Sequence, residues 1–290
     1  MSEILRLSNV SYVYSKGTPF ERLALDNVSV GFEKGKITGL IGHTGSGKST
    51  LVNLLNGLSK PTGGKILLDG RDIWENPKEI AKIRFRVGLV MQYPEYQLFA
   101  DTVGEDIAFG PKNMGLDSKE IEKRIFESIA FCGLNKDILD KSPFDLSGGQ
   151  KRRVALAGVM AMNPKILVLD EPAAGLDPKG RREILGGIKE YQRKSGNSVV
   201  IVSHSMEDMA MYCDRAIVMA HSRVVTHGTC EEVFSQHQLL LDVGLDVPEI
   251  TGIVLALRKK GVALPENIYT VDGAVSAIKS LYMEKNGGVE

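Results

Sequence analysis

The feature that most restricts how this chain can fold is a glycine-rich run placed between a strand candidate and a helix candidate. The run consists of Gly42, His43, Thr44, Gly45, Ser46, Gly47, Lys48, Ser49 and Thr50. Residues 37–41 before it are apolar enough for a strand, and leucines at helical spacing follow it over 48–56. This order predicts a strand, a tight loop and a helix in succession.

The composition of this loop indicates phosphate binding. Glycines let backbone N–H groups turn inward around phosphate oxygens, because a Cβ atom would block the approach. The helix that starts near Lys48 directs its positive dipole end at the same anion. Lys48 supplies a point charge for terminal phosphates, and the Ser49 hydroxyl suits Mg²⁺. The flanking strand and helix argue against the alternative, a glycine-rich turn with a chance lysine.

A second pattern is an apolar strand candidate that ends in two carboxylates. Residues 166–169 are apolar, and Asp170 and Glu171 follow directly. Two carboxylates at the end of a buried strand are costly unless they have cationic or protonic partners. Asp170 suits an outer contact with magnesium, and Glu171 suits a general base that polarises an attacking water. Taken alone, the pair is as consistent with a helix cap or a surface pair.

A third pattern begins a helix. Ser147 and Gln150 have the spacing of a capping box, and Gly148 and Gly149 lie between them. The free N–H groups and the dipole of such a helix can address an anion. In isolation, the better interpretation of these four residues is that they only cap a helix.

The three patterns in this order make the chain resemble the nucleotide-binding subunit of ABC transporters. The resemblance covers residues from about 3 to 228. In that family the signature residues of one subunit contact the γ-phosphate held by the other. The resemblance therefore implies that Ser147, Gly148, Gly149 and Gln150 bind ATP in trans, and that hydrolysis needs two subunits.

Other site residues follow from the resemblance one by one. Tyr14 matches the aromatic residue that stacks on adenine. Gln92 matches the glutamine that reaches magnesium and the water, and His204 matches the switch histidine at the γ-phosphate. Asp177 matches the loop that crosses the dimer seam, although Ala174-Gly175 departs from the commoner Ser-Ala. In isolation these would be a core tyrosine, a loop glutamine and a histidine before a helix cap.

The resemblance also implies the architecture. We expect an α/β P-loop NTPase of the ABC ATPase type over residues 1–228, with a RecA-like core and an antiparallel β subdomain. A helical subdomain is expected at about 95–163. Helical patterns after 228, including a capping box that starts at Thr229, predict a small C-terminal helical tail over 229–290.

Residues 92–99 carry three aromatic residues and a leucine in an expected surface loop, which is typical of a partner site; the alternative is that they pack against the chain's own helices. With residues 107–113 they resemble the ATPases of energy-coupling factor (ECF) transporters, bacterial importers of vitamins and of cobalt or nickel ions. The resemblance implies docking of an integral membrane subunit near 92–99, a second ATPase subunit (a paralogue or itself) and a substrate-specific membrane subunit. The alternatives are a conventional importer with a solute-binding protein, a non-transport ABC ATPase and a nucleotide-responsive module that does not hydrolyse.

Composition limits the other function classes. The 290 residues carry a net charge of +0, so no bulk field recruits nucleic acid, and we expect no nucleic-acid partner. The Lys151-Arg152-Arg153 run is typical of a solvated helix face. The three cysteines and the absence of a signal-peptide pattern predict a reduced, cytosolic protein. Without an apolar run of about 18 residues, we expect a peripheral protein at the cytoplasmic face of the bacterial membrane.

Overall fold

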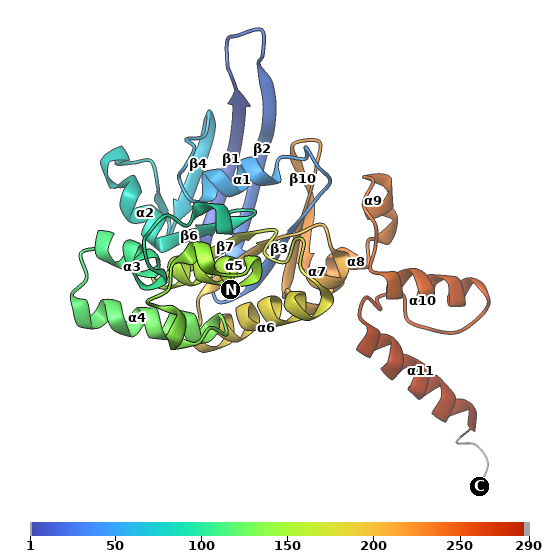
Figure 1. Ribbon diagram of the computed structural model, residues 1–290. Coiled ribbons are helices and arrows are strands. Elements are labelled where there is room, and N and C mark those ends of the chain that lie inside the picture. Colours follow the sequence, from blue (N-terminus) through green and yellow to red (C-terminus); the bar gives the residue numbers. More distant parts are fainter. Residues whose placement is uncertain (1, 287–290) are drawn as a thin grey trace.

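The computed structural model describes residues 2–286 and is built on two β-sheets (Figure 1). The larger sheet has six strands in the order β10-β9-β3-β8-β7-β6. Its first five strands in sequence are parallel, and β10 pairs antiparallel with β9. The strands are β3 (Ile37–Ile41), β6 (Val87–Val90), β7 (Ile166–Asp170), β8 (Ser198–Val202), β9 (Arg215–Ala220) and β10 (Arg223–Thr229).

This sheet is buried on both faces, which explains why its strands are continuously apolar rather than alternating. In β7, Ile166 and Val168 join one core cluster, while Leu167 and Leu169 join the other. The strand predicted over 37–41 is confirmed with the same bounds. The two clusters place the parallel sheet as the middle layer of the molecule.

The smaller sheet is antiparallel and covers one face of the middle layer through α1. Its order is β2-β1-β4-β5. The elements are β1 (Glu3–Tyr14), β2 (Arg22–Glu33), β4 (Gly63–Leu68), β5 (Arg71–Asp72), α1 (Lys48–Leu55) and the nearby α2 (Ile80–Arg86). Leu51, Leu54 and Leu55 of α1 pack in the cluster that also contains the sheet's apolar residues. β1 is one continuous strand whose register against β2 is irregular.

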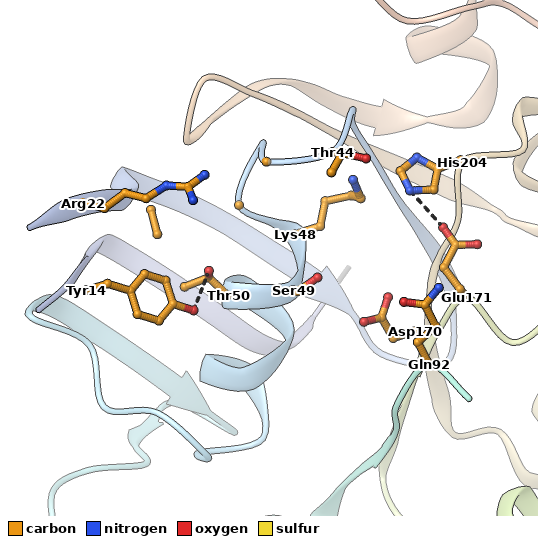
Figure 2. A pocket seen from close by; sticks show the side chains of 13 residues that line it. Tyr14, Arg22, Thr44, Lys48, Ser49, Thr50, Gln92, Asp170, Glu171 and His204 are labelled. Carbon is orange, nitrogen blue, oxygen red and sulfur yellow. Dashed lines mark hydrogen bonds and ion pairs between the residues drawn. The ribbon is translucent and has the colours of Figure 1, made fainter. Parts of the chain in front are cut away.

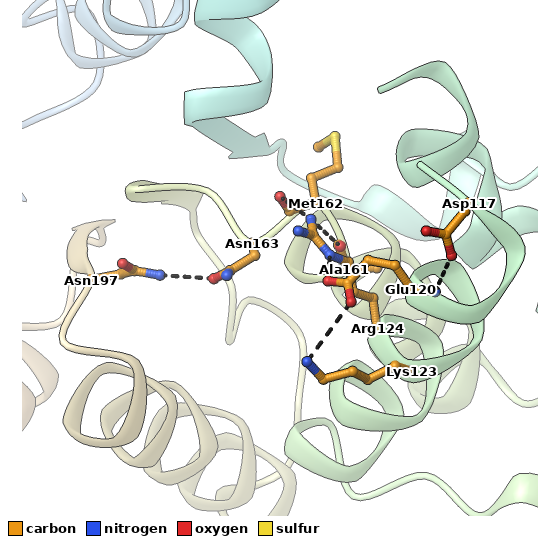
Figure 3. Close-up of polar contacts among 8 residues, drawn as sticks. All are labelled: Asp117, Glu120, Lys123, Arg124, Ala161, Met162, Asn163 and Asn197. Atoms are coloured by element: carbon orange, nitrogen blue, oxygen red, sulfur yellow. Dashed lines mark hydrogen bonds and ion pairs between the residues drawn. The ribbon is translucent and has the colours of Figure 1, made fainter. Parts of the chain in front are cut away.

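The helical region lies on the other face. Its helices are α3 (Val103–Asn113), α4 (Ser118–Phe131) and α5 (Gly148–Met160). The side chains of Thr102 and Asp117 cap α3 and α4, each accepting a hydrogen bond from the backbone N–H three residues later. Arg124 of α4 donates to the carbonyls of Ala161 and Met162 and so holds the end of α5 (Figure 3).

Two further helices follow the carboxylate strand and β8. They are α6 (Pro178–Ser195) and α7 (Met206–Tyr212). Asp177 caps α6 by accepting the Gly180 N–H, with Pro178 at the first helical position. Arg181 of α6 forms an ion pair with the buried Asp208 of α7 at 2.7 Å. This pair fixes α7, the helix that follows His204, against the start of α6.

The chain after β10 divides into two parts. The first part, α8 (Cys230–Phe234) and α9 (His237–Asp242), packs on the main core through Val233, Phe234 and Leu240. The second, α10 (Glu249–Lys259) and α11 (Val271–Asn286), has its own small core around Val254 and Leu264. Figure 1 shows these last helices extending away from the layered body. The boundary near 228 stays a prediction, because α8, α9 and the side chains of Val247 and Tyr269 all pack on the main core.

No helix among residues 2–286 combines the length and apolar character needed to cross a membrane.

Candidate functional site

A cavity of about 530 Å³ opens where the parallel strands end (Figure 2). The carboxyl ends of parallel strands lie at one edge of a sheet, and that edge is where α/β proteins bind ligands. Here β3, β6, β7 and β8 each lead into a segment that reaches the cavity. The lining residues are Tyr14, Arg22, Ala24, Thr44, Gly45, Gly47, Lys48, Ser49, Thr50, Gln92, Asp170, Glu171 and His204.

The glycine-rich loop requires glycine at two positions for reasons of space. A Cβ atom on Gly42 would lie 2.4 Å from the carbonyl oxygen of Met219. One on Gly47 would lie 2.6 Å from the carbonyl oxygen of Ala24, and its φ of +106° is itself in the left-handed region. The predicted loop is therefore held in shape by its neighbours. Gly42, His43 and Ser46 belong to the loop but do not line the cavity. The centres of the His43 and His221 rings lie 5.8 Å apart.

Lys48 is buried and points back along the loop. Its Nζ donates to the carbonyl oxygen of Gly42, and to that of His43 at 3.0 Å. Burial lowers the pKa of Lys48, and the nearby carboxylates of Glu171 and Asp170 oppose that shift. A cation already removed from water interacts strongly with an incoming polyanion.

The two carboxylates behave as a coupled pair. Burial raises the pKa of Asp170, against the effect of Lys48. Burial also raises the pKa of Glu171, the neighbouring Asp170 raises it further, and Lys48 lowers it. Glu171 has a φ of +50°, which is rare for a residue with a side chain, and its backbone N–H donates to Val202 at 2.9 Å. A buried carboxylate with an elevated pKa on a constrained backbone has the character of a general base.

His204 faces Glu171 across the cavity edge. Its Nε2 lies 3.3 Å from Glu171 Oε1, and Figure 2 shows the two side chains directed at each other. That carboxylate oxygen has no aligned hydrogen bond among the described residues. Burial and then Lys48 lower the pKa of His204, which favours the neutral imidazole. The two side chains can therefore share a water or a phosphate oxygen between them.

Ser49, Gln92 and Asp170 all line the cavity and present oxygen atoms. Hydroxyl, amide and carboxylate oxygens are the ligands that Mg²⁺ accepts, usually together with waters and substrate phosphates. The donor set of this chain therefore fits a magnesium ion bound with a nucleotide.

Tyr14 and Arg22 stand at the far end of the cavity. The Tyr14 hydroxyl lies 3.1 Å from Thr50 Oγ1, and its ring is exposed. Arg22 is a cavity residue that the sequence did not indicate. Arg22 pairs with Tyr14 across the β1–β2 hairpin. The register of this hairpin is therefore the feature that would have identified Arg22 as a cavity residue.

The remaining predicted residues lie elsewhere. Ser147, Gly148, Gly149, Gln150 and Asp177 are not among the residues that line this cavity. Ser147 and Gln150 form the predicted capping box at the start of α5, with both reciprocal hydrogen bonds present. A Cβ atom on Gly148 or Gly149 would meet no described atom within 4 Å. The chain's own packing therefore does not require glycine at these two helical positions.

The elevated pKa of Glu171 predicts a pH-dependent stability difference. A carboxyl group whose pKa is higher in the folded state than in the unfolded state favours folding below the unfolded pKa. That contribution is lost as the pH rises through the folded value. We expect Glu171→Gln, which carries no charge, to raise the Tm above that of the wild type at pH 7–8. The gain should vanish below pH 4.5, the ordinary value for Glu.

Thermal unfolding of both proteins across pH 4–8 checks this. Glu183→Gln, on the exposed side of α6, is the matched control and should show no such pH-dependent gain. A Tm difference between Glu171→Gln and wild type that is constant with pH would contradict the assigned environment of Glu171.

Comparisons with known proteins agree with this geometry. A family model described as ABC transporter matches residues 25–174. The energy-coupling factor transporter ATP-binding protein EcfA2 of Caldanaerobacter subterraneus subsp. tengcongensis is 50% identical over 270 residues, 93% of this chain and 94% of that protein. EcfA2 of Clostridium perfringens is 48% identical over 283 residues, 97% of this chain and 99% of that protein.

Solved structures show the same fold. The cbiO1 protein from Clostridium perfringens, described as part of the ABC transporter complex cbiONQ, is 39% identical with a TM-score of 0.74. It covers 88% of this chain and 99% of its own. The ATP-binding cassette MJ0796, described as a dimer bound to ADP and Pi, is 30% identical with a TM-score of 0.70. It covers 78% of this chain and 98% of its own.

The chain is therefore an ABC-type ATPase, a member of the ABC transporter family that binds and hydrolyses ATP. Within that family it belongs with the ATP-binding proteins of energy-coupling factor transporters. The predicted fold class and the predicted family are both confirmed.

Proposed function

We propose that this chain powers an ECF-type importer of vitamins or transition-metal ions by binding Mg-ATP between two ATPase subunits and hydrolysing it there. The observation that carries the proposal is that the cavity is lined without the residues at the start of α5. The glycine loop, the carboxylates and His204 gather in it, while Ser147 and its two glycines lie outside it. A second subunit that presents its own α5 start would complete the site.

The open glycines of α5 support this two-subunit site. Gly148 and Gly149 are the first two residues of α5, and neither has a neighbour within the described chain that would exclude a Cβ atom. Because these two glycines have no Cβ atom, a phosphate held by another subunit can approach the α5 backbone closely. Asp177, at the cap of α6, lies on the loop that we assign to the same seam.

The chemistry follows from the positions of the side chains. Lys48 and the loop N–H groups hold the terminal phosphates, and Tyr14 packs on the adenine. Ser49, Gln92 and Asp170 would hold Mg²⁺, which supplies charge neutralisation at the phosphates when bound. Glu171 accepts a proton from the attacking water, while His204 orients that water together with Gln92. Positioning and electrostatic stabilisation account for most of the rate in such phosphoryl transfers.

The membrane partners are assigned to the loop at residues 92–99. Tyr96 is 85% exposed and Phe99 is 59% exposed, and the Phe99 ring packs edge-on against the exposed Phe109 at 4.9 Å. Exposed aromatic clusters of this kind mark protein contacts. We assign the cluster to an integral membrane subunit at the cytoplasmic face, with a substrate-specific membrane subunit and a second ATPase, a paralogue or itself, completing the assembly.

The docking assignment predicts the effect of a charge placed in the cluster. Phe99→Asp should reduce co-purification with the membrane subunits by about tenfold or more, because a desolvated charge at an interface costs several kcal/mol. ATP binding by the variant should be unchanged. Phe20→Asp, at an exposed phenylalanine of the distant β1–β2 hairpin, is the matched control. Full membrane assembly of Phe99→Asp would remove the loop from this role.

A conventional ABC importer with a separate solute-binding protein remains the second candidate. The relatives named as ECF transporter proteins favour the first, since they match along nearly the whole chain, including the tail. Identifying the subunits that co-purify with the chain from membranes separates the two. An ECF-type assembly would yield a substrate-specific membrane subunit, and a conventional importer would require a solute-binding protein.

A further inference from the structure

Arg152 in α5 does not occupy the solvated face that its charged neighbours predict. The residue is only 5% exposed. Its Nη2 and Nε donate to the two carboxylate oxygens of Glu95 at 3.1 and 3.2 Å. Glu95 belongs to the short 3-10 helix Pro94–Gln97, inside the loop at residues 92–99. A buried, two-pronged ion pair thus joins that loop to the helix that begins at Ser147.

The same guanidinium reaches a third segment. Its Nη1 donates to the carbonyl oxygen of Ala174. The N–H of Ala174 in turn donates to the carbonyl oxygen of Glu171 at 3.1 Å. Ala174 therefore lies in the short stretch between the general base Glu171 and Asp177, the cap of α6. Arg152 holds this stretch by the main chain, where a change of side chain would not release it.

Tyr93 adds a fourth contact. The guanidinium carbon lies 5.7 Å from the centre of the Tyr93 ring, within the range of cation–π attraction. Tyr93 has a φ of +54°, a left-handed conformation that a side-chain residue adopts only when its surroundings hold it there. Gln92, which faces the cavity, is the preceding residue. The strained backbone next to Gln92 is thus packed against Arg152.

We propose that Arg152 is a positioning residue that joins the 92–99 loop, the start of α5 and the 171–177 stretch into one mechanical unit. A displacement of the loop by a partner would then move Ser147 and Glu171 together. This step rests on the proposed docking of a partner at residues 92–99. Arg152 does not line the nucleotide cavity; it contacts Tyr93 and Glu95 of the 92–99 loop and connects that loop to the site.

The chemistry of the Arg152 side chain supports a role in connecting the three segments rather than in stability alone. A buried ion pair is often replaced by apolar residues without loss of stability, so stability alone does not require it. Only a planar guanidinium can make a two-pronged contact with a carboxylate and still donate to a separate carbonyl. Lysine at this position would carry the charge but lack the fork.

Hydrogen exchange on the full chain tests the connection without requiring turnover. Arg152→Met and Glu95→Gln are compared with Lys151→Met, which removes the same charge from the same turn of α5. Arg152→Met and Glu95→Gln should both speed amide exchange over residues 172–177, although Glu95 itself lies on a different segment. Lys151→Met should leave those amides unchanged. Unchanged exchange at 172–177 in Glu95→Gln would overturn the proposal.

Turnover in the assembly with co-purified membrane subunits provides the second readout. Arg152→Met should lower kcat by about 10²-fold, the scale on which misplaced catalytic groups lose rate, with ATP affinity unchanged. Arg152→Lys should restore only part of it. Glu95→Gln combined with Arg152→Met should be no worse than Arg152→Met alone.

If Arg152→Met lowered the unfolding midpoint but kept the wild-type kcat, Arg152 would contribute only to stability. Failure of the wild-type assembly to hydrolyse ATP would count against the proposed function instead, and the exchange experiment would still decide the role of Arg152.

Discussion

Glu171→Gln is expected to abolish ATP turnover, with a loss of about 10²–10⁴-fold or more, the range that a positioned general base contributes. The glutamine keeps the shape and packing of the side chain but cannot accept a proton. Because the glycine loop and Lys48 are untouched, the variant should bind ATP as the wild type does. In the proposed two-subunit site hydrolysis releases the subunits, so the ATP-bound dimer of this variant should accumulate.

Three measurements check this result together. Phosphate release measures turnover, a fluorescent nucleotide measures affinity, and size-exclusion chromatography with ATP measures the dimer. Glu183→Gln serves here as well as in the stability experiment, since it makes the same chemical change on the surface of α6. Turnover near the wild-type rate in Glu171→Gln would remove the residue from its assigned role.

Lys48→Met is expected to lose ATP affinity by about 10²-fold, because a hydrogen bond to a charged group contributes about 1.5–3 kcal/mol. Each 1.4 kcal/mol corresponds to about a tenfold change in affinity. The methionine fills the volume of the lysine stem but leaves the terminal phosphates without their cation. Since burial of the Lys48 ammonium is itself unfavourable, the variant should be at least as stable as the wild type.

Calorimetric titration with ATP and thermal unfolding separate the two effects. Lys16→Met, at an exposed position in the β1–β2 turn, is the control for loss of one positive charge. A Lys48→Met variant that binds ATP with wild-type affinity would show that the lysine does not contact the nucleotide. Loss of both affinity and stability would indicate a collapsed loop rather than a missing cation.

The local signals in this sequence were strong where chemistry and backbone geometry coincide. The glycine loop, the capping box at Ser147 and the strand that ends at Asp170 each require particular residues at particular spacing. The topology explains why they converge on one cavity, because parallel strands deliver their carboxyl ends to one edge. The roles of Gln92, His204 and Tyr14 came from family resemblance, since single polar residues after strands carry no such signal.

Contacts between distant segments could not be predicted in this way. Arg22 reaches the cavity only through the register of the β1–β2 hairpin. Arg152 looked like one of three surface charges, and its burial depends on Glu95 and Ala174, which are far from it in the sequence. The sequence also did not show how the tail divides, because helical patterns do not indicate which core each helix packs against.

The separate core of α10 and α11 has a consequence for how such a subunit can diversify. Substitutions in residues that share no partners add independently in free energy, so changes around Val254 and Leu264 have little effect on the nucleotide cavity. The contacts between the two parts lie at their surfaces: the Glu249 N–H donates to Glu207 Oε1 on α7 at 3.2 Å, and the Tyr269 ring stacks on that of Phe234. Substitutions can therefore accumulate in α10 and α11 while the residues of the nucleotide cavity stay unchanged.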